Sequence, residues 1–104
     1  MSYEDLLKRA LEIQSKYDEL NNIHSRDAWN AQNYMAGFVG DVGDLSKIIM
    51  AKEGLRSMED VDTKLAHELS DCLWSVLVLA DKYNIDLASE FMKNMDALEK
   101  RISE

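Results

Sequence analysis

The chain of 104 residues contains no proline and only four glycines. Tight turns and sheet connections depend heavily on these two residues, whereas long helices joined by short links need few of them. Apolar residues make up 46% of the sequence, which is enough for a packed core and too many for a disordered segment. The sequence therefore predicts an all-α protein, with a single domain over residues 1–104.

The spacing of apolar residues predicts four helices, over residues 3–21, 27 or 28 to 53, 60–83 and 87–102. Local signals support their ends. Ser2 and Asp86 are suited to cap the first and fourth helices, and Gly54 and Asn84 are suited to the left-handed residue that ends a helix. Short links favour antiparallel neighbours, so we expect a four-helix bundle.

Three of the four glycines, Gly37, Gly40 and Gly43, recur at every third position of the second predicted helix. Each costs about 1 kcal/mol relative to alanine inside a helix. Their spacing places them along one side of the helix, where a backbone or a ligand could approach closely. The sequence leaves both explanations open.

The run C-L-W-S-V-L-V-L-A at residues 72–80 is apolar nearly all round the third predicted helix. A helix without a polar side needs more than one packed neighbour. The simplest arrangement is self-association through this helix, which predicts a homodimer or a homotetramer. The alternative is a helix at the centre of a monomer, which so short a chain can hardly surround.

Acidic residues outnumber basic ones by 20 to 12, which gives a formal net charge of −8. Such a chain is poorly suited to bind the backbone of a nucleic acid polymer. It can still bind a nucleotide if a divalent cation lies between the two sets of negative charge. No apolar run approaches the length of a membrane span, and the acidic N-terminal residues do not resemble a signal peptide. We therefore expect a cytoplasmic protein. Cys72 is the only cysteine, so an internal disulfide is not possible.

Two pairs of acidic residues carry the chemistry: Asp41 with Asp44, and Glu68 with Asp71. Residues three apart share one side of a helix, so each pair directs its carboxylates the same way. Both pairs lie among apolar residues, where unpaired buried acids are strongly disfavoured. If the two helices are antiparallel neighbours, the four carboxylates converge on an all-oxygen site suited to Mg²⁺ or Mn²⁺.

A plainer interpretation is that the acidic pairs lie on solvated edges and form ion pairs with residues such as Lys47 and Lys64. His24 and His67 are isolated in the sequence and have no zinc-type spacing.

Three segments carry a resemblance to a known family. Residues 38–45 read F-V-G-D-V-G-D-L, residues 68–71 read E-L-S-D, and residues 84–87 read N-I-D-L. They are similar to the motifs G-E-V-G-E-L, E-L-S-D or E-L-A-D, and G-I-D-L of the MazG-type, all-α nucleoside triphosphate pyrophosphohydrolases. This superfamily includes dimeric dUTPases and dCTP pyrophosphatases. The 23 residues between Asp44 and Glu68 also fit the family pattern.

The resemblance implies hydrolysis of a nucleoside triphosphate between its α- and β-phosphates, which yields a monophosphate and pyrophosphate. It implies that Asp41, Asp44, Glu68 and Asp71 are the catalytic acids and the ligands of Mg²⁺. It also implies further substrate-binding residues: Trp29 and Asn33 near the base, and Lys93 and Asn94 near the phosphates and sugar.

The chain departs from the family where Asp41 and Asp44 replace the usual glutamates. Each side chain is one methylene shorter, so the metal must lie closer to the second helix or water must fill the gap. Gly40 and Gly43 would permit the closer approach. Leu98 also stands where the family often has a polar residue.

Three functions are therefore consistent with the sequence. The first is a pyrophosphohydrolase of (deoxy)nucleoside triphosphates that clears non-canonical ones. The second is a catalytically inactive nucleotide-binding or regulatory module, which the two aspartates favour. The third is a structural helical module that pairs with a partner through its apolar third helix.

Overall fold

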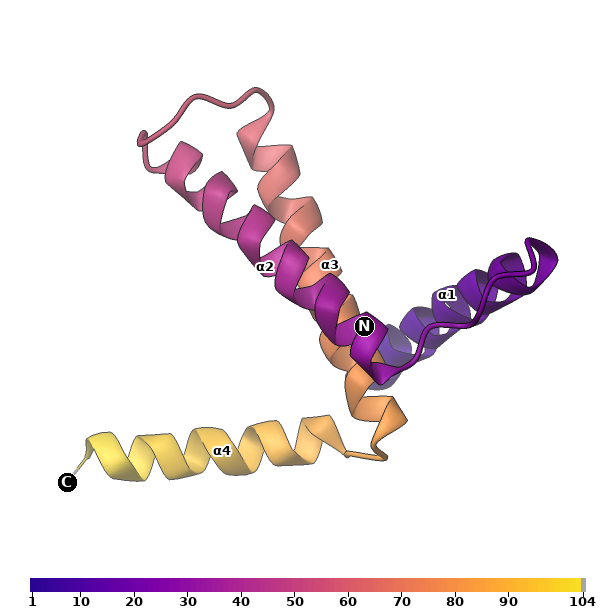
Figure 1. Cartoon of the computed structure of the whole chain (residues 1–104). Helices are drawn as coiled ribbons and strands as arrows, with labels where there is room; N and C mark the ends of the chain where they lie inside the picture. Colours follow the sequence, from indigo (N-terminus) through magenta and orange to yellow (C-terminus); the bar gives the residue numbers. More distant parts are fainter. Residues whose placement is uncertain (104) are drawn as a thin grey trace.

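The computed structural model describes residues 1–103, which form four α-helices and no strand (Figure 1). The helices are α1 (Tyr3–Ile23), α2 (Ala31–Lys52), α3 (Val61–Lys82) and α4 (Leu87–Ile102). The predicted all-α class and the number of helices are confirmed. Within the described residues, no helix combines the length and the apolarity needed to span a membrane.

Most predicted helix ends are confirmed by local hydrogen bonds or backbone angles. The Ser2 side chain accepts a hydrogen bond from the Asp5 amide at 3.2 Å. The Asp86 side chain accepts one from the Ser89 amide at 3.2 Å. Gly54 and Asn84 have φ angles of 81° and 54°, which places both in the left-handed conformation that ends a helix.

The predicted start of the second helix is wrong by three or four residues, since α2 begins at Ala31. Asn30 and Asn33 form a reciprocal cap. The side chain of each accepts a hydrogen bond from the backbone amide of the other, both at 3.0 Å. This capping box satisfies amides at the helix start and fixes the boundary there. Trp29 therefore lies in the link before α2.

Helices α2 and α3 form an antiparallel pair with their axes side by side (Figure 1). At one end, Lys52 Nζ lies 2.6 Å from Asp62 Oδ1. At the other end, the rings of Tyr34 and Trp74 meet edge to face, with centroids 5.6 Å apart. The buried apolar residues of the chain are mostly on this pair: Tyr34, Ile48, Leu77, Val78 and Ala80, with Ala10 of α1.

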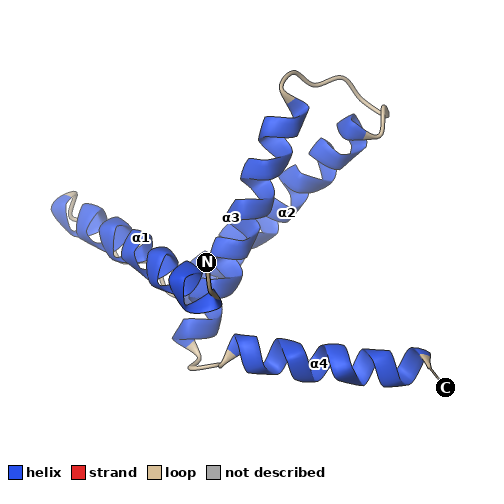
Figure 2. Ribbon diagram, turned by 180° about the vertical axis from the view of Figure 1, so that it is seen from behind, coloured by secondary structure: helices blue, strands red, loops and turns tan. Residues whose placement is uncertain are grey.

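Helix α1 packs against α3 and leaves the α2–α3 pair at an angle (Figure 2). The indole nitrogen of Trp74 donates a hydrogen bond to the Ala10 carbonyl at 3.0 Å. The ring of Tyr17 lies 6.0 Å from that of Trp74, centroid to centroid. Trp74 therefore joins α1 to α3, which is a structural role.

Helix α4 projects from the end of α3, away from the α2–α3 pair (Figure 2). None of its residues is buried, and Phe91 is 55% exposed. The radius of gyration is 16.7 Å, whereas a compact domain of this length has about 13 Å. The four helices are thus more open within one chain than a closed bundle would be.

Candidate functional site

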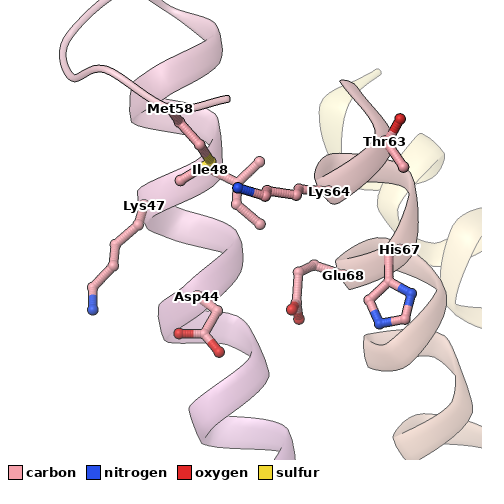
Figure 3. Close-up of a pocket in the computed structure, with 8 residues that line it drawn as sticks. All are labelled: Asp44, Lys47, Ile48, Met58, Thr63, Lys64, His67 and Glu68. Carbon is pink, nitrogen blue, oxygen red and sulfur yellow. The ribbon is translucent and has the colours of Figure 1, made fainter. Parts of the chain in front are cut away.

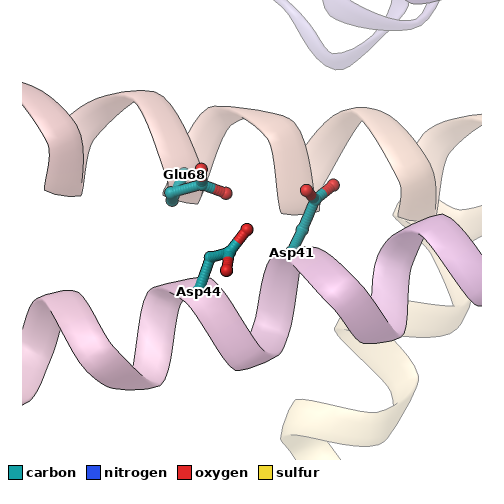
Figure 4. Close-up of side chains that lie close together, drawn as sticks. All are labelled: Asp41, Asp44 and Glu68. Carbon is teal, nitrogen blue, oxygen red and sulfur yellow. The ribbon is translucent and has the colours of Figure 1, made fainter.

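The site is built on facing sides of α2 and α3. Asp41 and Asp44 lie one turn apart on α2, and Glu68 lies opposite them on α3 (Figure 4). One carboxylate oxygen from each of the three lies within 4.8 Å of the other two. We call these three residues the acidic cluster. The structure thus brings together three of the four predicted metal ligands, because α2 and α3 are antiparallel neighbours.

Within residues 1–103, no member of the acidic cluster forms an ion pair, and His67 is the one nearby group that lowers the pKa of Asp41 and Glu68. Burial raises the pKa of Asp41, and the nearby charges of Asp71 and Asp44 raise it further. Burial also raises the pKa of Glu68, to which Asp41, Asp71 and Asp44 add. Glu68 Oε2 is buried and has no hydrogen-bond partner among residues 1–103. The other such oxygen among residues 1–103 is Asp18 Oδ1. A buried polar atom without a protein partner is usually explained by a bound water or ion.

Asp71, the fourth predicted ligand, has a different partner. Its Oδ2 atom lies 3.1 Å from Nε2 of His67, one turn earlier on α3. It remains close enough to the acidic cluster to raise the pKa of Asp41 and Glu68. His67 is therefore not isolated as predicted, and its i, i+4 spacing to Asp71 is a sequence signal for this contact.

The structure does not contain the ion pairs between lysines and the acidic pairs that the plainer interpretation predicts. Across the part of the chain that is described, the ion pairs are Arg9–Glu12, Lys52–Asp62, His67–Asp71 and Lys93–Glu90. None of them joins Lys47 or Lys64 to the acidic cluster.

A cleft of about 630 Å³ lies beside the acidic cluster, between α1, α2 and α3. It is rich in aromatic side chains, and the rings of Trp29 and Tyr34 meet edge to face at 5.3 Å. Asp41 belongs to both the cleft and the acidic cluster. The lining residues are Ile13, Tyr17, Leu20, Asn21, Arg26, Trp29, Tyr34, Gly37, Asp41, Ser70, Asp71, Trp74 and Ser75. We call this space the aromatic cleft.

A second cavity of about 450 Å³ lies nearer the link between α2 and α3. Figure 3 shows Asp44 and Glu68 facing each other across it, with Lys64 reaching from α3 toward α2. Its lining residues are Asp44, Lys47, Ile48, Met58, Thr63, Lys64, His67 and Glu68. We call it the lysine cavity. The acidic cluster therefore contributes Asp41 to the aromatic cleft and its other two members to the lysine cavity.

The four predicted substrate-binding residues fall into two groups. Trp29 lines the aromatic cleft and is 46% exposed, so part of its indole is open to a ligand. Asn33 is occupied by the α2 cap and lines neither cavity. Lys93 and Asn94 lie on α4 and line neither cavity, and Lys93 Nζ is 3.6 Å from Glu90 Oε1. The structure therefore does not bring Asn33, Lys93 or Asn94 to the site.

The three glycines of α2 differ in the space around them. A Cβ atom on Gly37 would lie 3.3 Å from the indole of Trp29, so glycine makes room for that ring. A Cβ atom on Gly40 or Gly43 would meet nothing within 4 Å among the described residues. Among residues 1–103, Gly37 is thus the one helical glycine that another part of the protein approaches closely.

Three residues that line the aromatic cleft, Tyr34, Asn21 and Arg26, are not among the predicted site residues. Tyr34 precedes Asp41 by seven residues, which is about two helical turns, so a shared side of α2 was a readable signal. Asn21 and Arg26 lie at the end of α1 and in the following link, where no periodicity marks them.

No family model, no curated protein and no solved structure matches this chain.

Proposed function

We propose that this chain is a Mg²⁺-dependent, MazG-like pyrophosphohydrolase that converts a (deoxy)nucleoside triphosphate and water to the monophosphate and pyrophosphate. The observation that carries the proposal is the convergence of Asp41, Asp44 and Glu68 next to the aromatic cleft. Carboxylates for a divalent cation and aromatic rings for a base are the two kinds of group that a nucleotide with bound metal requires.

The residues present fit a hard divalent cation. The acidic cluster offers only oxygen ligands, which Mg²⁺ and Mn²⁺ prefer. Burial, and after it the neighbouring carboxylates, raise the pKa values of Asp41 and Glu68, and a bound cation would offset both effects. Glu68 Oε2 has no partner among residues 1–103. Asp71 is the fourth candidate ligand, beside this cluster. When bound, Mg²⁺ supplies neutralisation of the phosphate charge and a lower pKa for nearby water.

The aromatic cleft fits the rest of a nucleotide. Its volume of about 630 Å³ lies within the usual range of about 300–1,000 Å³ for small-ligand sites. The partly exposed indole of Trp29 offers a flat face to a base. Asn21 and Arg26 add polar groups at the cleft wall, where they would orient sugar or base.

The proposed reaction forms one bond and breaks one. A water oxygen bonds to the α-phosphorus, the bond from that phosphorus to the oxygen bridging to the β-phosphate breaks, and the water proton passes to a carboxylate. Lys47 and Lys64, on the wall of the lysine cavity, are suited to the charge of the leaving pyrophosphate.

We further propose that the active form is a cytoplasmic homodimer or homotetramer that acts on non-canonical nucleotides. A nucleic acid polymer and a membrane are not proposed as partners, since the net charge of −8 disfavours the first and no described helix suits the second.

Two observations favour a catalytically inactive nucleotide-binding or regulatory module. Asp41 and Asp44 have shorter side chains than the glutamates of the resembling family. Helix α4, which carries Lys93 and Asn94, projects away from the α2–α3 pair (Figure 1). Such a module would use the same metal and cleft without turnover. A purely structural helical module would need neither.

The deciding experiment measures pyrophosphate release from a panel of NTPs and dNTPs, with Mg²⁺ and with Mn²⁺. Glu68→Gln removes one charge of the acidic cluster, and Glu99→Gln is the matched control on exposed α4. We expect release by the unaltered protein and by Glu99→Gln, and none by Glu68→Gln.

Two other results would contradict the proposal. Metal-dependent nucleotide binding without pyrophosphate release would favour the regulatory module. Absence of both binding and release, with no rise in melting temperature on adding Mg²⁺, would favour the structural module.

A further inference from the structure

Of the four acids in the two acidic pairs, only Asp71 has an ion-pair partner among residues 1–103. That partner is His67, whose Nε2 lies 3.1 Å from Asp71 Oδ2. A proton on Nε2 attracts the carboxylate both in the neutral tautomer that carries it and in the charged ring. The contact therefore occupies one oxygen of Asp71.

Helical geometry shows in which direction His67 holds Asp71. Glu68 lies opposite Asp41 and Asp44 of α2 (Figure 4). Seen along α3, Asp71 is rotated from Glu68 by about 60° and His67 by about 100°, both in the same sense. Figure 3 shows the Glu68 carboxylate reaching toward α2 and the His67 ring further from it. His67 therefore holds the Asp71 carboxylate on the side of α3 that turns away from α2.

The two cavities divide the acids in the same way. Asp44, Glu68 and His67 line the lysine cavity, whereas Asp71 lines the aromatic cleft with Asp41. Asp71 also contributes no oxygen to the set in which all ligand atoms lie within 4.8 Å of one another. Asp71 is thus close to the acidic cluster without belonging to it, and the side chain that contacts it there is His67.

The number of available carboxylate oxygens decides which hard cation an acidic site prefers. Mg²⁺ requires near-octahedral geometry, keeps several waters and is usually bound by few carboxylates. Ca²⁺ is larger, takes about six to eight oxygens, and often receives both oxygens of one carboxylate. Three carboxylates that each offer one oxygen suit Mg²⁺ with water and phosphate around it. A fourth carboxylate with two free oxygens would bring the site closer to what Ca²⁺ prefers.

We infer that His67 is a positioning residue that sets the cation preference of the acidic cluster. By holding Asp71 Oδ2, it keeps Asp71 from supplying both oxygens to a cation, and it thereby favours Mg²⁺ over Ca²⁺. His67 can act in this way only if the acidic cluster binds a divalent cation, so the inference rests on the proposed function. It adds a residue outside the predicted site and a property that the acidic pairs alone do not supply.

A purely structural role for the same contact has a different consequence. An exposed i, i+4 pair on a helix stabilises that helix slightly and does nothing more. Such a role leaves the preference between two cations unchanged when His67 is replaced. The preference between Mg²⁺ and Ca²⁺ therefore separates the two roles.

The test uses melting temperatures of the full chain, titrated with MgCl₂ and separately with CaCl₂ at constant ionic strength. Each titration gives an apparent Kd, because a ligand of the folded state raises its stability. The measured quantity is the ratio of the two constants. Both cations carry the same charge, so a change in the net charge of a variant acts on both constants alike and cancels in the ratio.

Three single variants are compared. His67→Leu removes the N–H group, and His67→Gln keeps an N–H donor. The matched control is His24→Leu, which alters the other histidine, an exposed residue at the end of α1 that lines neither cavity. The His67 side chain is 71% exposed, so its replacement removes no core packing. Melting temperatures without added cation check this point.

We expect His67→Leu to shift the ratio toward Ca²⁺ by about 10-fold, since loss of an outer partner of a metal ligand usually changes metal affinity by about 10- to 100-fold. His67→Gln and His24→Leu should keep the ratio of the unaltered chain. Because the effect acts through Asp71, adding Asp71→Asn to His67→Leu should remove most of the shift.

Several results would overturn the inference alone and leave the cation site in place. These are an unchanged ratio in His67→Leu, a shift toward Mg²⁺, an equal shift in His67→Gln, and a shift that persists in the double variant with Asp71→Asn. If neither cation stabilises the unaltered chain, both the inference and the cation site of the proposed function are wrong.

Discussion

Asp71 Oδ2 lies 3.1 Å from Nε2 of His67, whereas Asp41, Asp44 and Glu68 face one another between α2 and α3. The two residues of the E-L-S-D segment therefore differ in environment. Glu68 points into the space between the helices with one oxygen unpartnered, whereas Asp71 has a partner on its own helix. A cation entering the site would meet Glu68 without displacing any protein contact.

The first prediction follows from that difference. Glu68→Gln should weaken Mg²⁺ binding by more than Asp71→Asn does, because Asp71 lies outside the acidic cluster and is held by His67. Isothermal titration calorimetry with Mg²⁺, in the presence of a non-hydrolysable triphosphate, measures both. Equal losses of affinity in the two variants would contradict the assignment and place Asp71 among the direct ligands.

The second prediction concerns stability and pH without nucleotide. The pKa values of Asp41 and Glu68 are raised in the folded state, so the folded state binds more protons than the unfolded one between the ordinary and the raised pKa. The contribution of these two groups to the free energy of unfolding therefore falls as pH rises through that window. Above it, both carboxylates are charged and their repulsion is complete. Mg²⁺ should raise the melting temperature most above the raised pKa values, and progressively less as pH falls through them.

Thermal melts from pH 4 to 8, with and without Mg²⁺, check this second prediction. The double variant Asp41→Asn, Glu68→Gln should lose both the pH dependence from these groups and the response to Mg²⁺. A double variant that Mg²⁺ still stabilises as much as the unaltered chain would show that the cation binds elsewhere.

The third prediction tests the aromatic cleft. Trp29→Ala should weaken nucleotide binding by about 1–3 kcal/mol, which is the usual loss when a base loses a stacked aromatic ring. Trp29→Phe should retain most of the affinity. Dissociation constants of both variants, measured with Mg²⁺ present, decide the matter. Unchanged binding by Trp29→Ala would mean that the base lies outside this cleft.

The fourth prediction compares two glycines of α2. Gly40→Ala should raise the free energy of unfolding by about 1 kcal/mol, since alanine favours the helix and its Cβ meets nothing within 4 Å. Gly37→Ala should gain clearly less, because its Cβ would lie 3.3 Å from the Trp29 indole and the ring would have to shift. Urea denaturation measures both. Equal gains would show that the Trp29 ring does not occupy the space beside Gly37.

The sequence by itself determined what depends on near neighbours along the chain. The lack of proline and the apolar spacing fixed the helical class, and Ser2, Gly54, Asn84 and Asp86 marked helix ends through local caps and backbone angles. Two predicted boundaries were wrong. Helix α1 continues to Ile23, two residues beyond its predicted end, and α2 starts later than predicted. The Asn30–Asn33 capping box overrode the earlier start near residue 27.

Only the tertiary structure decided which side chains meet, because contacts between helices depend on their rotation and register against each other. It placed Asp41 and Asp44 opposite Glu68, paired Asp71 with His67, and packed Trp29 against Gly37. It also held α4, with Lys93 and Asn94, away from the site. The i, i+3 spacing of each acidic pair directs two carboxylates the same way, but packing of α2 against α3 is what makes them converge.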